Sequence, residues 1–405
     1  MDGAGSTHLL SGTREYRRTS RVLFGAGFMA FSMLYVVQGV LPDVSSSFGV
    51  SPAVSSLTLS LTTLPLAIAV LVAASWSEGQ GRRLLLVGSL VAAAVLTVLA
   101  SASPSFGVLL TLRVLTGMVL AGLPPVAMAY VAEEFHPSSL GAAMGLYISG
   151  TGLGGMTGRL AGGLISSVLS WRAALLVVGA CCLVGAAMVA RWLPSSRNFV
   201  MAPGGMRDRL SGMRTPLADG VVVRLAVCGF LIMGSLVSFF NYLQYRLARE
   251  PFDLSSTVVA LVFLLYLFGT VSANWMGRLT DRRSRRMVLV LGLVIMLAGA
   301  LASLPDLLLT ALAGGALMVF GFFGAHSVAS GWVSRRTPGQ RAQASALYLF
   351  GYQLGSTVVG FGGGLMFGAY GWSGEVATVG VLLVLGLLVA ASLPAASPKE
   401  AVRAS

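Results

Sequence analysis

Three ionisable side chains lie inside long apolar stretches, namely Arg113, Arg159 and His326. A histidine gains and loses a proton near neutral pH, so His326 is the first candidate for a proton carrier. A buried histidine can equally be a structural hydrogen-bonding residue. Guanidinium groups hold anions through paired hydrogen bonds, so both arginines are candidates for proton coupling or for binding an anion. Glu133 and Glu134 end another apolar stretch and are competing proton carriers.

Polar and aromatic side chains in the same apolar stretches could line a substrate cavity. Tyr35 and Gln38 share one helix face through their i, i+3 spacing. Tyrosines also anchor helices at membrane interfaces, so only part of this set need line a cavity. The candidates are Tyr35, Gln38, Tyr147, Asn241, Tyr242, Tyr348, Tyr352 and Gln353.

Covalent and metal chemistry find no support in the sequence. The three cysteines, Cys181, Cys182 and Cys228, lie in apolar stretches without metal-ligand spacing. We see no cluster of serine, histidine and aspartate and no phosphate-binding loop. We therefore expect no enzyme activity, no cofactor, no metal site and no disulfide.

The elements that must position these residues are membrane-spanning helices. Of the 405 residues, 56% are hydrophobic and 10% are charged, whereas an average soluble domain is about 25% charged. Such a chain cannot cover a globule with polar surface, which argues against a soluble enzyme. Spanning helices need about 20 apolar residues, and the sequence predicts twelve, six within 22–193 and six within 225–393. No Asp or Glu lies centrally in any predicted span, the last of which is expected at Val376–Leu393.

The net charge of +13 could indicate nucleic-acid binding, but the positions of the charges argue against it. With both termini inside the cell, 22 of the 27 basic residues fall in inner segments. The predicted outer loops hold Arg172, Arg246 and Arg249. Basic residues concentrate in cytoplasmic loops of membrane proteins. We therefore expect a multi-pass protein with cytoplasmic termini and no nucleic-acid partner.

The two halves of the chain repeat each other. The segment LYISGTGLGGMTGRLAGGL from Leu146 matches LYLFGYQLGSTVVGFGGGL from Leu347 at an offset of 201. Parallel six-helix repeats of this kind build one class of transporter. The sequence therefore predicts an all-α protein with an N-terminal six-helix bundle in 1–193, a cytoplasmic linker in 194–220 and a C-terminal six-helix bundle in 221–405.

Two charged loops occupy equivalent places in the halves, ASWSEGQGRR at 74–83 and GRLTDRRSRR at 277–286. Both resemble the signature loop of the major facilitator superfamily, although the first departs more from its pattern. We expect a gating latch in which acidic residues meet arginines and helix N-termini, with Arg82 pairing with Glu133 or Glu134. The alternative is that these charges only set the orientation of the chain. The latch residues are Glu78, Arg82, Arg83, Asp281 and Arg285.

Further segments resemble one branch of that superfamily. The run RVLTGMVLAG from Arg113 is similar to the fourth-helix motif of the superfamily. The run GTGLGGMTGRLAGG from Gly150 is similar to the antiporter motif of the fifth helix, although this chain lacks the proline usual there. EEFHPSSLGAAMGLYISG from Glu133, GFFGAHSVASGW from Gly321 and SALYLFGYQLGS from Ser345 resemble the YnfM-type carriers of the acriflavine-sensitivity branch of drug:proton antiporters.

This resemblance implies a bacterial inner-membrane carrier that exports a small molecule against proton entry by alternating access. It brings Arg159 and His326 forward as branch features. The expected partners are a small-molecule substrate, protons and the lipid bilayer, and we expect a monomer. The alternative on the same fold is a sugar or organic-anion transporter, because arginines in a cavity would suit an anion. A membrane enzyme or a sensor is the third possibility, and the sequence favours neither.

Overall fold

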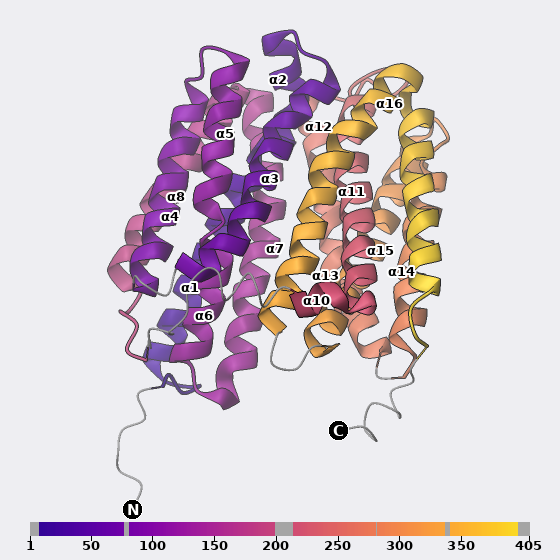
Figure 1. Cartoon of the computed structure of the whole chain (residues 1–405). Coiled ribbons are helices and arrows are strands. Elements are labelled where there is room, and N and C mark those ends of the chain that lie inside the picture. Colours follow the sequence, from indigo (N-terminus) through magenta and orange to yellow (C-terminus); the bar gives the residue numbers. More distant parts are fainter. Residues whose placement is uncertain (1–7, 77–80, 199–213, 281, 337–340, 396–405) are drawn as a thin grey trace, which may run out of the picture. The chain divides into compact units, whose positions relative to one another are not determined.

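The computed structural model of the chain describes residues 8–76, 81–198, 214–280, 282–336 and 341–395. The described residues fold almost entirely into helices (Figure 1). Hydroxyl and carboxyl side chains fix where several of these helices begin, because they accept hydrogen bonds from the unpaired N–H groups of the first turn. Helix N-caps of this kind are Thr13, Ser105, Ser170, Asp219 and Ser284.

The chain divides into two compact units. Unit 1 comprises Met1–Val40 and Pro65–Arg207, and unit 2 comprises Leu41–Leu64 and Asp208–Ser405. The helices of unit 1 are α1 (Arg14–Tyr35), the 3₁₀-helix η1 (Val36–Val40), α4 (Arg82–Ser101), α5 (Phe106–Leu120), α6 (Leu123–Glu134), α7 (Pro137–Val168) and α8 (Trp171–Trp192). Helix α3 (Pro52–Trp76) contributes to both units.

Unit 2 contains the helices of the second half of the sequence and a short part of the first. Its elements besides α3 are α2 (Leu41–Phe48), α10 (Arg214–Ala218), α11 (Gly220–Leu247), α12 (Ser256–Leu261), the 3₁₀-helix η2 (Val262–Tyr266), α13 (Leu267–Leu279), α14 (Arg285–Ala302), α15 (Leu308–Arg336) and α16 (Arg341–Ala391). The linker expected at 194–220 lies largely outside the described residues. The division of the chain at this linker therefore stays a prediction.

Twelve crossings can be identified in the described parts of the chain. Nine helical segments there are long and apolar enough to span a membrane. One of them, Gln343–Ala391, covers all but the first two residues of α16, which breaks at Gly371 with φ 63° and ψ −152° and so forms two spans. Pro52–Ile68 of α3 is a shorter apolar helix, and α7 has 32 residues whose many glycines lower its hydropathy. The all-α membrane fold is confirmed.

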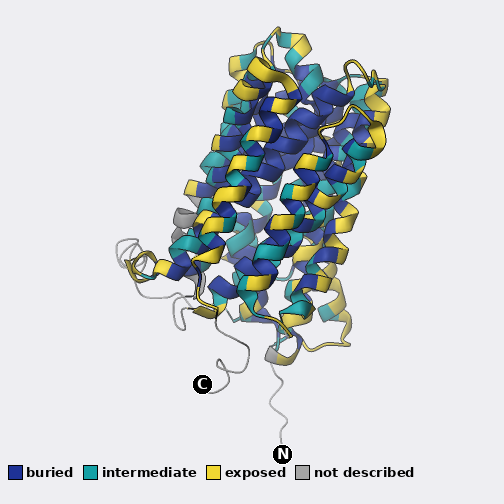
Figure 2. Cartoon of the chain, turned by 90° about the vertical axis from the view of Figure 1, so that its right-hand side faces the viewer, coloured by how far each residue is buried: buried dark blue, intermediate teal, exposed yellow. Residues whose placement is uncertain are grey.

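Lipid-facing surfaces are visible in the burial pattern. Exposed residues alternate with buried ones along the helices in Figure 2, and many exposed positions carry large apolar side chains. Val184 is 64% exposed, and Leu309 is 79% exposed. Soluble proteins rarely expose so many such side chains together, whereas contact with lipid requires them.

The same glycine-mediated helix packing occurs once in each unit, as the sequence repeat predicts. In unit 1, α7 lies so close to α1 that a Cβ on Gly154 would lie 2.1 Å from the carbonyl oxygen of Phe28. In unit 2, a Cβ on Gly355 of α16 would lie 2.0 Å from the carbonyl oxygen of Phe230 of α11. Small residues permit this close approach of helices in membranes. Further glycines on the same helix faces form, with Gly154 and Gly355, a glycine stripe in each helix. They are Gly150, Gly158 and Gly162 in α7 and Gly351 and Gly363 in α16.

Candidate functional site: a buried arginine cluster and a histidine cluster

Arg159 of α7 forms the centre of a polar cluster inside unit 1. Its Nε donates to Oε1 of Gln38 at 2.6 Å, and its Nη1 donates to the carbonyl oxygen of Gly155 at 2.7 Å. The guanidinium also lies over the ring of Tyr35, 3.7 Å from the ring centroid. Arg159 is 4% exposed. Gln38, Gly155 and Tyr35 thus help to stabilise a positive charge within a membrane-spanning helix, where an isolated charge is costly.

The local backbone explains how these residues meet. Helix α1 tightens into the 3₁₀-helix η1 after Tyr35, and Gln38 lies in this tighter segment. Gly39 touches α7, where a Cβ would lie 2.1 Å from the carbonyl oxygen of Arg159. The absence of a side chain at Gly39 therefore allows α7 to approach closely enough for Arg159 to reach Gln38.

Arg113 of α5 donates hydrogen bonds to backbone carbonyl groups of α1. Its Nη1 donates to the carbonyl oxygen of Met33 at 3.1 Å, and its Nη2 donates to that of Leu34 at 2.8 Å. These carbonyl groups precede η1, where the change from α to 3₁₀ geometry alters the helical hydrogen-bonding pattern. Arg113 is fully buried. Its two hydrogen bonds stabilise the first span at the point where α1 changes into η1.

His326 of α15 belongs to an aromatic cluster in unit 2. Its Nδ1 lies 2.8 Å from the hydroxyl oxygen of Tyr348. Its ring stacks on Phe322, with ring centroids 5.8 Å apart, and lies 4.8 Å from the ring of Tyr352. The histidine is only partly buried. The cluster joins three of the residues singled out in the sequence, His326, Tyr348 and Tyr352.

The charged end of unit 1 contains an ion pair between the expected latch residues. Arg82 donates through Nη2 to Oε1 of Glu133 at 2.7 Å and through Nε to Oε2 at 3.3 Å. Glu134 has a different role, because its Oε1 accepts from the backbone N–H of Arg197 at 2.7 Å and of Asn198 at 3.0 Å. Glu133 is therefore the acid that pairs with Arg82. The other two acidic latch candidates, Glu78 and Asp281, lie outside the described residues.

The two copies of the charged loop share one contact and differ in another. Arg83 donates to the carbonyl oxygen of Ala190, and Arg286 donates to that of Leu393, at an offset of 203 in both partners. Glu133 has no acidic equivalent, because the same offset leads to Arg336. Arg285, the equivalent of Arg82, is partly buried. The paired acid of the first copy is thus replaced by a base in the second.

Arg336 instead binds Asp219, the N-cap of α11, with 2.9 Å between Nε and Oδ2. Oδ1 of Asp219 accepts from the N–H of Val221 at 2.8 Å and of Val222 at 3.4 Å. Burial raises the pKa of the Asp219 carboxyl group, but the hydrogen bonds from Val221 and Arg336 and the charge of Arg336 outweigh it, so the pKa is lowered overall.

The remaining cavity candidates have different surroundings within their own units. Tyr147 is fully buried against Gly27, where a Cβ would lie 3.1 Å from its ring. Tyr242 donates to the carbonyl oxygen of Gly360, and Asn241 is fully buried nearby, with its Nδ2 3.5 Å from the Cβ position of Gly360. Gln353 is 7% exposed. Tyr35 and Gln38 gather at Arg159, whereas Tyr348 and Tyr352 gather at His326.

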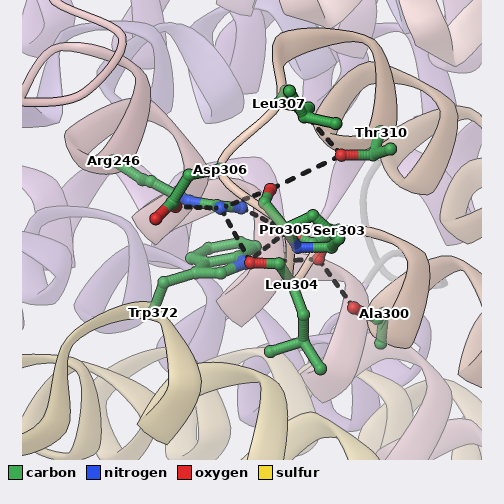
Figure 3. A network of polar contacts seen from close by, with 9 residues as sticks. All are labelled: Arg246, Ala300, Ser303, Leu304, Pro305, Asp306, Leu307, Thr310 and Trp372. Carbon is green, nitrogen blue, oxygen red and sulfur yellow. Dashed lines mark hydrogen bonds and ion pairs between the residues drawn. The ribbon is translucent and has the colours of Figure 1, made fainter.

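Arg246 corrects the expectation that it lies in an outer loop. It falls in the last turn of α11 and is 6% exposed. Its Nη2 donates to Oδ1 of Asp306 at 2.9 Å and to the carbonyl oxygens of Leu304 at 3.1 Å and Pro305 at 2.9 Å. Figure 3 shows the guanidinium among these oxygens and beside Trp372, whose ring centroid is 4.9 Å away. Arg246 therefore joins α11 to the segment between α14 and α15.

Glu375 is a buried acid that sequence reasoning did not single out, because that reasoning considered only acids central to a span. The second span of α16 resumes directly after Gly371, so it includes Glu375 rather than beginning at Val376. The residue is fully buried. The signal that could have found it is its place beyond Trp372, the repeat equivalent of Trp171, which begins α8.

Hydroxyl groups of Leu41–Leu64 form a polar contact within unit 2 that sequence reasoning missed. Ser55 Oγ lies 2.6 Å from the hydroxyl oxygen of Tyr245, which also donates to the carbonyl oxygen of Leu41 at 2.8 Å. Ser60 donates to the carbonyl oxygen of Thr357 at 3.2 Å. The serines and threonines of this segment could have indicated a polar helix face.

Among the described residues, no group of three or more His, Cys, Asp or Glu side chains is placed to bind a metal ion.

Comparison with known proteins agrees with this fold. Residues 23–246 and 225–405 match the sequence profile of the Major Facilitator Superfamily. The chain is 41% identical over 383 residues to the uncharacterized MFS-type transporter YybF of Bacillus subtilis, covering 94% of each chain. It is 41% identical over 384 residues to the inner membrane transport protein YnfM of Escherichia coli, covering 94% of this chain and 92% of that one.

More distant similarities extend the same pattern. A chloramphenicol resistance protein of Streptomyces lividans is 26% identical over 375 residues, covering 91% of this chain and 92% of that protein. The inward-facing, unoccupied crystal structure of a bacterial homologue of the human lysosomal transporter Spinster superposes with a TM-score of 0.80 at 18% identity, covering 94% of this chain and 97% of that one. A D-xylose–proton symporter superposes with a TM-score of 0.72 at 15% identity, covering 94% and 98%.

These two structures show the fold alone, whereas the profile and the relatives at 41% identity span nearly the whole chain. The protein therefore belongs to the Major Facilitator Superfamily, a family of multi-pass membrane transporters of small molecules and not of enzymes.

Proposed function

We propose that this protein is a proton-coupled exporter of a small organic molecule that works by alternating access. The observation that carries the proposal is His326, which lies within a membrane-spanning helix and meets Tyr348 at hydrogen-bond distance. Histidine is the side chain that exchanges a proton near neutral pH, and a proton-driven carrier needs such a group inside the membrane. The partly buried ring leaves room for proton exchange.

A bacterial inner-membrane location with cytoplasmic termini is part of this proposal. In unit 1, Leu9 forms backbone hydrogen bonds with Glu134 and His136, so the N-terminal segment lies at the same end as the Arg82–Glu133 pair. In unit 2, Arg286 and Leu393 meet beyond the last span. Basic residues concentrate at these ends, which is the pattern of cytoplasmic segments. YnfM, an inner membrane transport protein by name, supports the same location.

Export of an organic molecule is supported by the resistance protein among the relatives. The chloramphenicol resistance protein is 26% identical to this chain over 91% of this chain's length. Chloramphenicol is therefore the first probe of export.

Transport of an organic anion is the second candidate. The observation that favours it is the Arg159 guanidinium, which is held in place by Gln38, Gly155 and Tyr35, all neutral. A guanidinium fixed in position can bind a carboxylate or phosphate ligand through paired hydrogen bonds. An exporter of acidic metabolites would use this charge for recognition and His326 for proton coupling.

Transport in vesicles tests the proposal. The purified protein is reconstituted in proteoliposomes, a pH gradient is imposed, and movement of chloramphenicol or of an organic anion is measured. We expect the gradient to drive substrate movement in the wild type. The His326→Gln variant should lose gradient-driven transport and keep exchange of labelled for unlabelled substrate. His136→Asn is the matched control, because His136 caps α7 outside the membrane and asparagine also caps helices.

Two results would contradict the proposal. Substrate movement that is indifferent to the gradient in the wild type would exclude proton coupling. Full gradient-driven transport in His326→Gln would exclude His326 as the carrier. Arg159→Lys separates the two substrate classes, because it should weaken anion transport far more than transport of a neutral compound; Arg191→Lys, at an exposed position, is its control.

A further inference from the structure

Glu375 is a buried carboxyl group that the proposed transport mechanism does not use. It lies four residues after Gly371, the break between the two spans of α16, so it is about 6 Å along the helix from that turn at 1.5 Å per residue. The residue is 0% exposed. Glu375 thus lies near the end of a span, and the helices of unit 2 cover it.

Its immediate neighbours are small and neutral. A Cβ on Gly363 would lie 1.9 Å from Oγ of Ser238 and 2.6 Å from Oε2 of Glu375, so both oxygens lie against this glycine. The Ser238 hydroxyl lies beside the carboxyl group without forming a hydrogen bond of ordinary geometry. Neither carboxyl oxygen of Glu375 has a hydrogen-bond partner among the described residues.

No fixed cation compensates the carboxyl group in the neighbouring described elements. Tyr242 and Arg246 are the titratable and charged groups on the facing part of α11, and Arg246 is held by Asp306 and by carbonyl oxygens of the segment between α14 and α15. Residues 287–302 of α14 and 308–325 of α15 contain no titratable side chain. Within 41–64, Asp43 is the single charged residue.

A carboxylate in this environment would be strongly destabilised. Transfer of an ionised carboxylate into an apolar interior without partners costs far more than transfer of the neutral acid, and such groups become neutral instead. The physical expectation is therefore that Glu375 carries a proton in this conformation. Hydrogen bonds from donors or entry of water would be needed before the carboxyl group could ionise.

Leu41–Leu64 packs against the face of α16 that contains Gly360 and Gly364, next to Gly363. Ser56 Oγ donates to the carbonyl oxygen of Gly360 at 3.2 Å. A Cβ on Gly364, the residue after Gly363, would lie 2.3 Å from the hydroxyl oxygen of Tyr242 and 2.6 Å from Cα of Ala53. Separation of Leu41–Leu64 from α16 would thus uncover the layer of α16 directly beside Glu375.

We propose that Glu375 is a proton-binding site, that it is protonated while Leu41–Leu64 packs against α11 and α16, and that it releases the proton when this contact opens. The proton leaves the carboxyl oxygen for water that enters the opened contact, and it returns from water before the contact closes. The inference rests on the proposed function, because it supplies a second proton-binding group for a proton-coupled carrier.

Infrared spectroscopy of the full chain in lipid tests the proton directly. We expect the C=O stretch of a protonated carboxylic acid at neutral pH in the wild type, loss of that band in Glu375→Gln, and its retention in Glu250→Gln. Glu250 is an exposed glutamate that no part of the mechanism uses. An unchanged spectrum in Glu375→Gln would overturn the proposal. Loss of the wild-type band on addition of sodium would also overturn it, because the site would then bind that cation.

A distance measurement tests the link to the contact. Spin labels are placed on cysteines at Ser46 and Ser373, both exposed positions of unit 2, in a chain whose three native cysteines are replaced by alanine. Raising the pH should shift the wild-type distance distribution to longer values. Glu375→Gln, which imitates the neutral acid, should abolish this shift, and Glu250→Gln should keep it. A pH-dependent shift that persists in Glu375→Gln would overturn the proposal.

The outcomes separate this inference from the proposed function. If the infrared band and the distance shift depend on Glu375 but a pH gradient drives no transport, the proton-binding site stands and proton-coupled export fails. If a gradient drives transport and neither signal depends on Glu375, export stands and the Glu375 site fails.

Discussion

Replacement of Gly154 by alanine should separate α7 from α1 and destabilise unit 1. In the structure, the added Cβ would lie 2.1 Å from the carbonyl oxygen of Phe28 and 2.7 Å from its Cα. A carbon–oxygen contact needs about 3.3 Å, so the helices must move apart by about 1 Å. The hydrogen bond from Ser32 Oγ to the carbonyl oxygen of Gly154, now 3.0 Å, would be strained by the same movement.

The size of the effect follows from these contacts. Overpacking of a close contact costs about 1–3 kcal/mol, and loss of the Ser32 hydrogen bond adds about 1 kcal/mol. Alanine favours the helix over glycine by about 1 kcal/mol, which offsets part of the loss. We therefore expect Gly154→Ala to lower the free energy of unfolding by about 1–3 kcal/mol.

Thermal unfolding of the purified protein in detergent measures this difference. Gly152→Ala is the matched control, because it lies in the same helix and a Cβ there meets nothing within 4 Å. At roughly 2–4 °C per kcal/mol, Gly154→Ala should lower the unfolding temperature by several degrees, and Gly152→Ala should leave it unchanged or raise it. Equal unfolding temperatures for the two variants would refute the claim that the glycine contact sets the distance between α1 and α7.

Three further predictions concern polar contacts. Glu133→Gln should destabilise the protein by roughly 2–4 kcal/mol, because it removes the acid paired with buried Arg82; an unchanged unfolding temperature would contradict this. Tyr245→Phe removes a hydroxyl group that bonds Ser55, so cysteine probes in 41–64 should react faster with aqueous thiol reagents, and equal rates would argue against a role in the contact. The lowered pKa of Asp219 makes its ionised form stabilising above the unfolded carboxyl pKa of about 3.9. This stabilisation disappears as the pH falls through the folded pKa, so Asp219→Asn should show a smaller loss of unfolding temperature on acidification than the wild type.

The glycine stripe illustrates how much of the fold was accessible in the sequence. The spacing of Gly150, Gly154, Gly158 and Gly162 places them on one helix face, and the offset of 201 predicts an equivalent face in α16. The structure shows that both faces pack against the first helix of their half. Side chains that contact lipid or a neighbouring helix must follow the helical period, so periodicity alone predicts such packing faces.

The sequence did not determine which acid pairs with Arg82. Two adjacent acids, Glu133 and Glu134, were equivalent partners for Arg82 by sequence position. One residue along a helix turns a side chain by about 100°, because a turn has 3.6 residues. Glu133 therefore faces Arg82 of α4, whereas Glu134 faces the backbone at Arg197. Only the rotation of α6 relative to its neighbours selects between the two acids.

Composition and apolar runs determined that this chain spans a membrane many times, because lipid accepts a helix only when nearly all its side chains are apolar. They also identified Arg159 and His326 as exceptions that need partners. The tertiary structure decided which partners these are. Gln38 and Arg159 are 121 residues apart, and Glu375 meets Ser238 across two helices. Such contacts depend on the distance and rotation between packed helices, which local sequence patterns do not specify.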